Sequence, residues 1–153
     1  MLQAHTAPVS ADVFYGTASV ASAAPTPQAI RMAAATLVIR EQLSDAKTLV
    51  ANGLIQYPDS EDLLVMQALI SEMNHDWTGA ATALENLVRV QNTRVPAETW
   101  CHWVRVLRCL GDWNKAAQVA KKALMQFPDH DMLQSEWQTL NSAPRQAIRK
   151  TAA

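Results

Sequence analysis

The segment from Glu98 to His130 has a counterpart that begins 70 residues earlier in the chain. At this offset Tyr57 falls on Phe127, and identical residues pair at five further positions: Ala46 and Ala116, Leu54 and Leu124, Gln56 and Gln126, Pro58 and Pro128, and Asp59 and Asp129. An offset of 36 residues gives a partial match, in which Asp76, Trp77, Ala80 and Ala81 fall on Asp112, Trp113, Ala116 and Ala117. Such self-similarity is typical of stacked repeat units, each of which buries its apolar face against a neighbour. The chain is therefore restricted to a repeat architecture.

Two helices with a tight turn between them are predicted in the segment from Glu98 to His130. The apolar residues of its first half recur at helical spacing, namely Trp100, Trp103, Leu107 and Leu110. Gly111-Asp112 interrupts the pattern, and Asn114 is a suitable N-cap for the second helix. One stripe of that helix carries Ala116, Val119, Ala120, Ala123 and Leu124. Pro128 ends it, because proline has no backbone N–H and clashes with the preceding turn. The small alanines allow close approach, which predicts a helical hairpin.

This hairpin resembles the tetratricopeptide repeat (TPR), a helix–turn–helix unit of about 34 residues. With Ala97 as its first residue, the bulky, glycine, small and proline positions of the family are occupied in phase by Trp100, Leu107, Gly111, Ala116, Ala123 and Pro128. The chain departs from the family at Trp103 and Val104, which stand where leucine and then a small residue are preferred. It departs again at Ala120, which replaces an aromatic residue. The resemblance implies an α-solenoid fold.

Two further hairpins are predicted before this one. The first begins at Thr26-Pro27, where threonine is a suitable N-cap and proline is tolerated at the first helical position. Its first helix is expected over residues 28–42, and Ser44 is expected to cap a second helix that runs to Gln56. The next hairpin is expected over residues 61–90, with its turn at residues 75–76. An irregular bend is expected over residues 90–96, where two extra residues lengthen the step to the third hairpin.

A last helix over residues 129–141 is expected to cover the apolar face of the third hairpin with Met132, Leu133, Trp137 and Leu140. The predicted fold class is thus all-α: a TPR-like α-solenoid of three helix–turn–helix hairpins plus a C-terminal capping helix. Residues 27–143 form this repeat domain. Residues 1–26 are expected to be a flexible or partner-dependent N-terminal arm, with a short helix over residues 9–21 as the alternative. Residues 144–153 are a basic tail, either a solvated terminus or a small anionic docking patch.

Composition restricts the possible partners and the compartment. A formal net charge of −1 argues against a broad surface for nucleic acid or for membranes. No stretch approaches the roughly 20 apolar residues of a membrane span. No lysine or arginine precedes Arg31, which argues against a secretory signal. Cys101 and Cys109 would lie about 12 Å apart on one helix, beyond disulfide reach. A reduced, cytoplasmic setting is therefore expected.

The sequence offers no catalytic or cofactor-binding pattern. The four histidines and two cysteines do not have metal-ligand spacing. Cys101 and His102 are adjacent, so on a helix they point about 100° apart, which is poor geometry for a nucleophile and its base. The glycines are scattered singly, so no phosphate-binding loop is present. The core is the expected place for Trp77, Trp100, Trp103 and Trp113. We expect a non-enzyme without a metal or cofactor.

The inner face of the solenoid is the expected binding surface, because solenoids commonly bind extended peptides or helices there. The resemblance assigns to this face three sets of residues: Gln28, Arg31, Ala35, Val38 and Ile39; Asp62, Val65, Leu69, Glu72 and Met73; and Glu98, Cys101, Arg105, Arg108 and Cys109. From these we expect partner contacts at Arg31, Val65, Leu69, Glu72, Met73, Cys101, Arg105 and Arg108. TPR proteins that clamp the acidic C-terminus of a chaperone need lysine and asparagine at inner positions. That pattern is absent here.

The function expected from this surface is non-catalytic. An apolar centre with basic edges suits a partner segment that has aliphatic anchors and a carboxylate, so we expect an adaptor or a small chaperone that holds a peptide or helix of a partner protein. The size and repeat number are similar to those of bacterial secretion-system chaperones of the TPR type. The alternative is a structural subunit of a larger bacterial assembly or secretion apparatus, in which neighbouring subunits fill the groove and the arm. A homo-oligomer is compatible with either.

Overall fold

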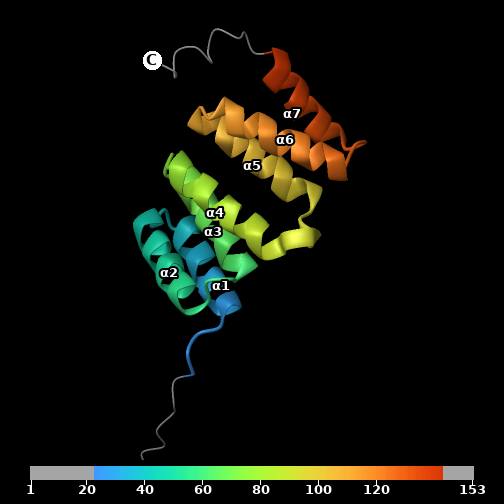
Figure 1. Cartoon of the computed structure of the whole chain (residues 1–153). Helices are drawn as coiled ribbons and strands as arrows, with labels where there is room; N and C mark the ends of the chain where they lie inside the picture. Colours follow the sequence, from blue (N-terminus) through green and yellow to red (C-terminus); the bar gives the residue numbers. More distant parts are fainter. Residues whose placement is uncertain (1–22, 143–153) are drawn as a thin grey trace, which may run out of the picture.

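A computed structural model describes residues 23–142 of the chain. Within this range the protein consists of helices and turns without a strand, and the hairpins are stacked in chain order (Figure 1). The helices are α1 (Pro27–Ile39), α2 (Leu43–Gln56), α3 (Glu61–Met73), α4 (Trp77–Gln91), the short 3-10 helix η1 (Asn92–Arg94), α5 (Ala97–Leu110), α6 (Trp113–Gln126) and α7 (Asp131–Ser142). The all-α solenoid predicted from the sequence is confirmed. The expected arm and tail lie outside the described residues, apart from the few residues just before α1.

Three hairpins and a terminal helix build the stack. The pairs α1–α2, α3–α4 and α5–α6 pack antiparallel, and each hairpin packs on the next through α2 on α3 and α4 on α5. On the inner side α1 contacts α3, and α5 contacts α7. Helix α7 also covers α6, with Leu133 fully buried, so the expected capping role is confirmed.

The turns inside the three hairpins are built in the same way. Glu41, His75 and Gly111 occupy equivalent places and all have positive φ, at 61°, 56° and 85°. In each turn the next backbone N–H reaches back to a carbonyl five residues earlier, as in Gln42 N to Leu37 O at 2.9 Å. This pattern is the Schellman motif, which usually places glycine at the left-handed residue. Helix α1 therefore ends at Ile39, earlier than the expected residue 42.

Side-chain caps begin most of the helices. The Thr26 hydroxyl accepts a hydrogen bond from Ala29 N at 3.2 Å, as expected. Asp76 and Asp112 cap α4 and α6 by accepting from Gly79 N and Lys115 N at 2.8 and 3.0 Å. Two expected caps were wrong. Ser44 lies inside α2, which begins at Leu43, and Asn114 follows Trp113 in the first turn of α6. The Schellman turns start these helices earlier than the polar residues suggest.

The irregular bend expected over residues 90–96 is present. The 3-10 helix η1 follows α4, and Asn92 has a φ of 53°. Val95 then points into the core and is 3% exposed, while Pro96 precedes the first residue of α5. The two residues beyond the usual repeat length thus form a short loop that buries Val95 between the second and third hairpins.

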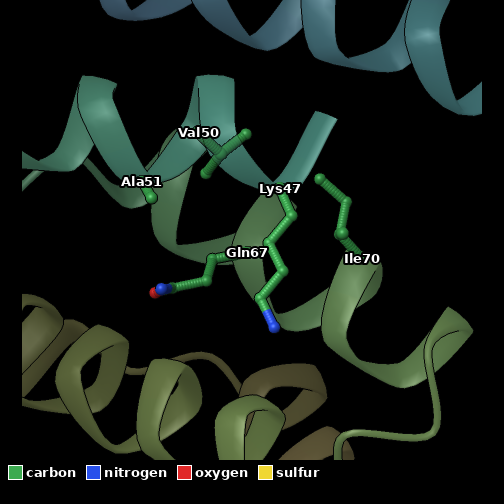
Figure 2. A pocket seen from close by; sticks show the side chains of 5 residues that line it. All are labelled: Lys47, Val50, Ala51, Gln67 and Ile70. Atoms are coloured by element: carbon green, nitrogen blue, oxygen red, sulfur yellow. The ribbon is translucent and has the colours of Figure 1, made fainter. Parts of the chain in front are cut away.

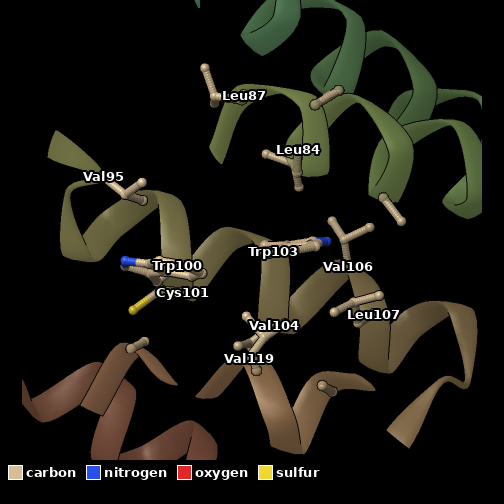
Figure 3. Packing of buried hydrophobic residues seen from close by; sticks show 14 of the residues in the cluster. Leu84, Leu87, Val95, Trp100, Cys101, Trp103, Val104, Val106, Leu107 and Val119 are labelled. Atoms are coloured by element: carbon tan, nitrogen blue, oxygen red, sulfur yellow. The ribbon is translucent and has the colours of Figure 1, made fainter. Parts of the chain in front are cut away.

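The larger core cluster lies around α5 (Figure 3). Trp100 and Trp103 stack with ring centroids 6.0 Å apart, with Leu84 of α4 on one side and Val119 of α6 on the other. These two tryptophans are core residues, as expected. Trp77 and Trp113 are only half-buried, because each is the first residue of its helix at the rim of a turn. Leu110 and Met132, which were expected on the apolar faces of their helices, are exposed.

Candidate functional site

Three adjoining hollows run along the inner helices of the described chain. The first, the α1–α3 hollow, has a volume of about 430 Å³ and an almost wholly apolar lining. Its only charged lining residue is Glu72. The lining consists of Ala35, Val38 and Ile39 from α1 and Met66, Leu69, Ile70, Glu72 and Met73 from α3. The hollow arises because α1 and α3 pack side by side while their longer apolar side chains turn outward.

The second hollow lies over α3 and α5 and continues the first. This α3–α5 hollow has a volume of about 370 Å³ and is lined by Leu69, Glu72, Glu98, Cys101, His102, Arg105 and Met132. Leu69 and Glu72 belong to both hollows. Met132 comes from the capping helix α7, so that helix completes the site as well as the core.

The third hollow, at the C-terminal end of α5, has a volume of about 360 Å³. Arg105, Arg108, Cys109 and Trp113 line this α5–α6 hollow, and Arg105 is shared with the second hollow. The three hollows therefore form one continuous surface, which we call the inner groove. Its character changes from apolar at α1 and α3 to charged at α5.

The apolar residues expected in the site lie where the groove is least polar. Leu69 and Met73 are 44% and 49% exposed, and both line the α1–α3 hollow. Val65 is also exposed on α3 but lines none of the three hollows. Methionine side chains are flexible and polarisable, so a surface that contains Met66, Met73 and Met132 adapts to partners of different shape.

The charged residues expected in the site differ in their surroundings. Arg105 is exposed and has no ion-pair partner among the described residues. Arg108 forms an ion pair with Glu136 of α7 and lies 5.9 Å above the ring of Trp113. Arg31 lies outside the hollows and is 3.9 Å from Asp62. Arg105 is thus the accessible cation of the groove.

Cys101 lines the α3–α5 hollow although its side chain is almost fully buried, at 3% exposure. Burial raises the pKa of the Cys101 thiol; the nearby carboxylates of Glu136 and Glu98 raise it further, and Arg105 opposes them. A thiol held in its neutral form in this way behaves as a packing group.

His102 was not expected in the site. Its position in the sequence, next to Cys101, does not indicate a partner on another helix, yet its imidazole bonds to the carboxylate of Glu72 on α3. The two residues are separated by 30 positions, close to one repeat length, and the other bonds between neighbouring hairpins have similar separations, as in Lys115 to Glu85. Polar side chains about one repeat apart are therefore the sequence signal that points to His102. Met66, Ile70, Met132 and Trp113 were also not expected in the site.

The described residues hold no group of three or more histidine, cysteine or acidic side chains that could bind a metal ion. None of the helices described, residues 27–142, is long and apolar enough to cross a membrane. A separate pocket between α2 and α3, lined by Lys47, Val50, Ala51, Gln67 and Ile70, has a volume of about 50 Å³ (Figure 2). That pocket is far smaller than the three hollows and has no room for a segment of a partner protein.

Comparisons with known proteins identify the fold. No family model matches the sequence, and no curated protein matches it. Among solved structures, the TPR domain of Sgt2 from Aspergillus fumigatus is 17% identical, with a TM-score of 0.63 over 82% of this chain and 84% of that domain. The second TPR domain of human RPAP3, determined in complex with the HSP70 peptide SGPTIEEVD, is 12% identical, with a TM-score of 0.62 over 76% of this chain and 99% of that domain. The chain therefore has the TPR-like helical-repeat fold that the resemblance implied.

Proposed function

We propose that this protein is a non-catalytic protein-interaction module that binds a segment of a partner protein in the inner groove. The observation that carries the proposal is the apolar lining of the α1–α3 hollow, where Ile39, Leu69 and Met73 are exposed at 82%, 44% and 49%. Exposed apolar side chains that gather around one hollow mark an interaction site more often than a free surface. Binding an apolar segment would remove them from water, which stabilises the complex.

The fold of RPAP3 supports a peptide as the class of ligand, because that TPR domain was determined with a bound peptide. The chemistry of the ligand is expected to differ here. Val65, Leu69 and Cys101 stand at inner positions where the clamp for acidic chaperone C-termini needs lysine or asparagine. We therefore propose a segment with aliphatic anchors, which suits an adaptor or a small chaperone. Cys101 and Cys109 are both free, which supports the proposed cytoplasmic setting.

The test is an affinity recovery from native lysate with the full chain at physiological salt. Leu69→Arg places a charge in the groove, and Ile55→Arg is the matched control, because Ile55 is 80% exposed on α2 and lines none of the three hollows. Circular dichroism checks that both variants fold. We expect wild type and Ile55→Arg to recover the same partner and Leu69→Arg to lose it.

Two other outcomes would redirect the proposal. Equal recovery by all three proteins would contradict binding in the groove. Recovery of only further copies of this chain would favour the alternative function, a structural subunit of a larger assembly whose groove is filled by a neighbour.

A further inference from the structure

The charges along the inner groove are mostly paired. Glu72 bonds to His102, and Arg108 pairs with Glu136. Two groove residues, Arg105 and Glu98, have no ion-pair partner among residues 23–142. They are seven residues apart on α5, which corresponds to about 10 Å along the helix axis. The free positive and negative charges of the groove are therefore at separate places.

Of Arg105 and Glu98, Arg105 lies closer to the middle of the groove. It lines both the α3–α5 and the α5–α6 hollow, whereas Glu98 lines only the former. Leu69 lines the α1–α3 and the α3–α5 hollow, so the apolar surface reaches the hollow that Arg105 borders. A ligand that fills the apolar hollow and continues along the groove thus comes to an exposed guanidinium.

We propose, building on the function proposed above, that the partner segment places aliphatic side chains in the α1–α3 hollow and a carboxylate against Arg105. A guanidinium presents a planar pair of N–H donors that matches a carboxylate. Leu69 lines both the apolar hollow and the hollow that Arg105 borders, so the acidic residue of an extended ligand lies within a few residues of its last aliphatic anchor.

The surroundings of Arg105 favour a carboxylate over a phosphate group. Arg108, the other arginine of the α5–α6 hollow, is already paired with Glu136. One free guanidinium balances the single charge of a carboxylate. A phosphate group carries about −1.5 to −2 charges and would need a second free cation.

A selection of random twelve-residue peptides on the full chain tests this inference. Peptides enriched on the wild-type protein are expected to combine leucine, isoleucine, valine or methionine with an aspartate or glutamate a few residues away. On Arg105→Glu the acidic preference is expected to change to lysine and arginine. Lys121→Glu makes the same change in net charge at an exposed position on α6 that lines none of the hollows, and it is expected to keep the wild-type preference.

Affinity measurements on one enriched peptide complete the test. Replacing its acidic residue by the neutral amide is expected to weaken binding to wild type about two- to fivefold, as for an exposed ion pair, and to leave Arg105→Glu without that loss. Aliphatic peptides without an acidic preference, or a preference that Arg105→Glu leaves unchanged, would overturn this inference and leave the proposed function standing. A library in which no peptide binds wild type better than Leu69→Arg would overturn both.

Discussion

His102 of α5 and Glu72 of α3 form a hydrogen bond across the floor of the inner groove. Both side chains are largely buried, at 20% and 25% exposure. Between the second and third hairpins the outer contact is broad, because α4 packs on α5, whereas α3 and α5 approach each other at few points. The pair therefore links the two hairpins at the side where the ligand is proposed to bind.

Removing one partner of this pair is expected to destabilise the fold. His102→Ala leaves a largely buried carboxylate without its partner, which costs about 1–3 kcal/mol of unfolding free energy. The double variant Glu72→Ala, His102→Ala removes both groups, so its loss should be smaller than the sum of the two single losses. Urea denaturation of the four proteins measures the difference. Strictly additive losses would mean that the two side chains act independently.

The left-handed turn residues predict a stabilising substitution. Glu41 and Gly111 hold equivalent places with φ of 61° and 85°, but only Gly111 is free of the clash of a Cβ. Glu41→Gly is expected to raise the unfolding free energy by about 0.5–1 kcal/mol, and Gly111→Ala to lower it by about 1 kcal/mol. Thermal and urea unfolding provide the readout. A lower unfolding free energy of Glu41→Gly would contradict this prediction. It would show that the glutamate side chain stabilises the fold by more than the strain of its positive φ destabilises it.

Gly53 lies where α2 packs closely against α1 and α3. A Cβ added there would lie 3.1 Å from Ile30 and from Leu63, and the equivalent residue 70 positions later is the fully buried Ala123. Gly53→Val is expected to lower the unfolding free energy by about 1–3 kcal/mol through overpacking. Asn52→Val places the same β-branched residue on the exposed side of α2 and serves as the control. Equal stability of the two variants would contradict a tight contact at Gly53.

The Asp76 cap predicts a component of acid sensitivity. The hydrogen bond from Gly79 N and the nearby Lys47 lower the pKa of Asp76 in the folded state below its ordinary 3.8. Because the folded pKa is depressed, this stabilisation is present above the unfolded pKa and is lost as the pH falls through the folded pKa. Asp76→Asn keeps the cap acceptor but removes the charge. Its deficit in unfolding free energy relative to wild type should therefore shrink between about pH 5 and the folded pKa. If the difference in unfolding free energy between Asp76→Asn and wild type does not change with pH, the charge of Asp76 does not contribute, and the difference comes from the geometry of the cap.

The fold could be predicted from the sequence because its causes are local and repeated. The matches between Pro58 and Pro128 and between Asp76 and Asp112 fix the ends and starts of helices, which then pack in chain order. The exact starts of α2 and α6 could not be predicted from polar residues alone. The Schellman bonds at Gln42 and Asp112 decide them, and in the first turn glutamate takes the place that glycine usually has.

The site was predictable only in part. Leu69, Met73 and Arg105 follow from the inner positions of single repeats, and the structure places all three along the groove. The residues that bind to the charged side chains of the groove come from neighbouring helices, and these contacts were not predicted. Glu136 on α7 forms an ion pair with Arg108, and His102 forms a hydrogen bond with Glu72. Met132 of the capping helix also lines the groove. Such contacts depend on how the hairpins are set against each other, which sequence spacing does not specify.

The central claim is that the partner binds in the inner groove, and site-specific photo-crosslinking tests it most directly. In one variant of the full chain a benzophenone amino acid replaces Met73, which lines the groove. In a second variant the same amino acid replaces Ile55 on α2, the outer helix of the first hairpin. The account predicts a discrete adduct with a partner from position 73, removed by the additional change Leu69→Arg, and none from position 55. Adducts from position 55 in place of 73, or the same adducts from both, would contradict it.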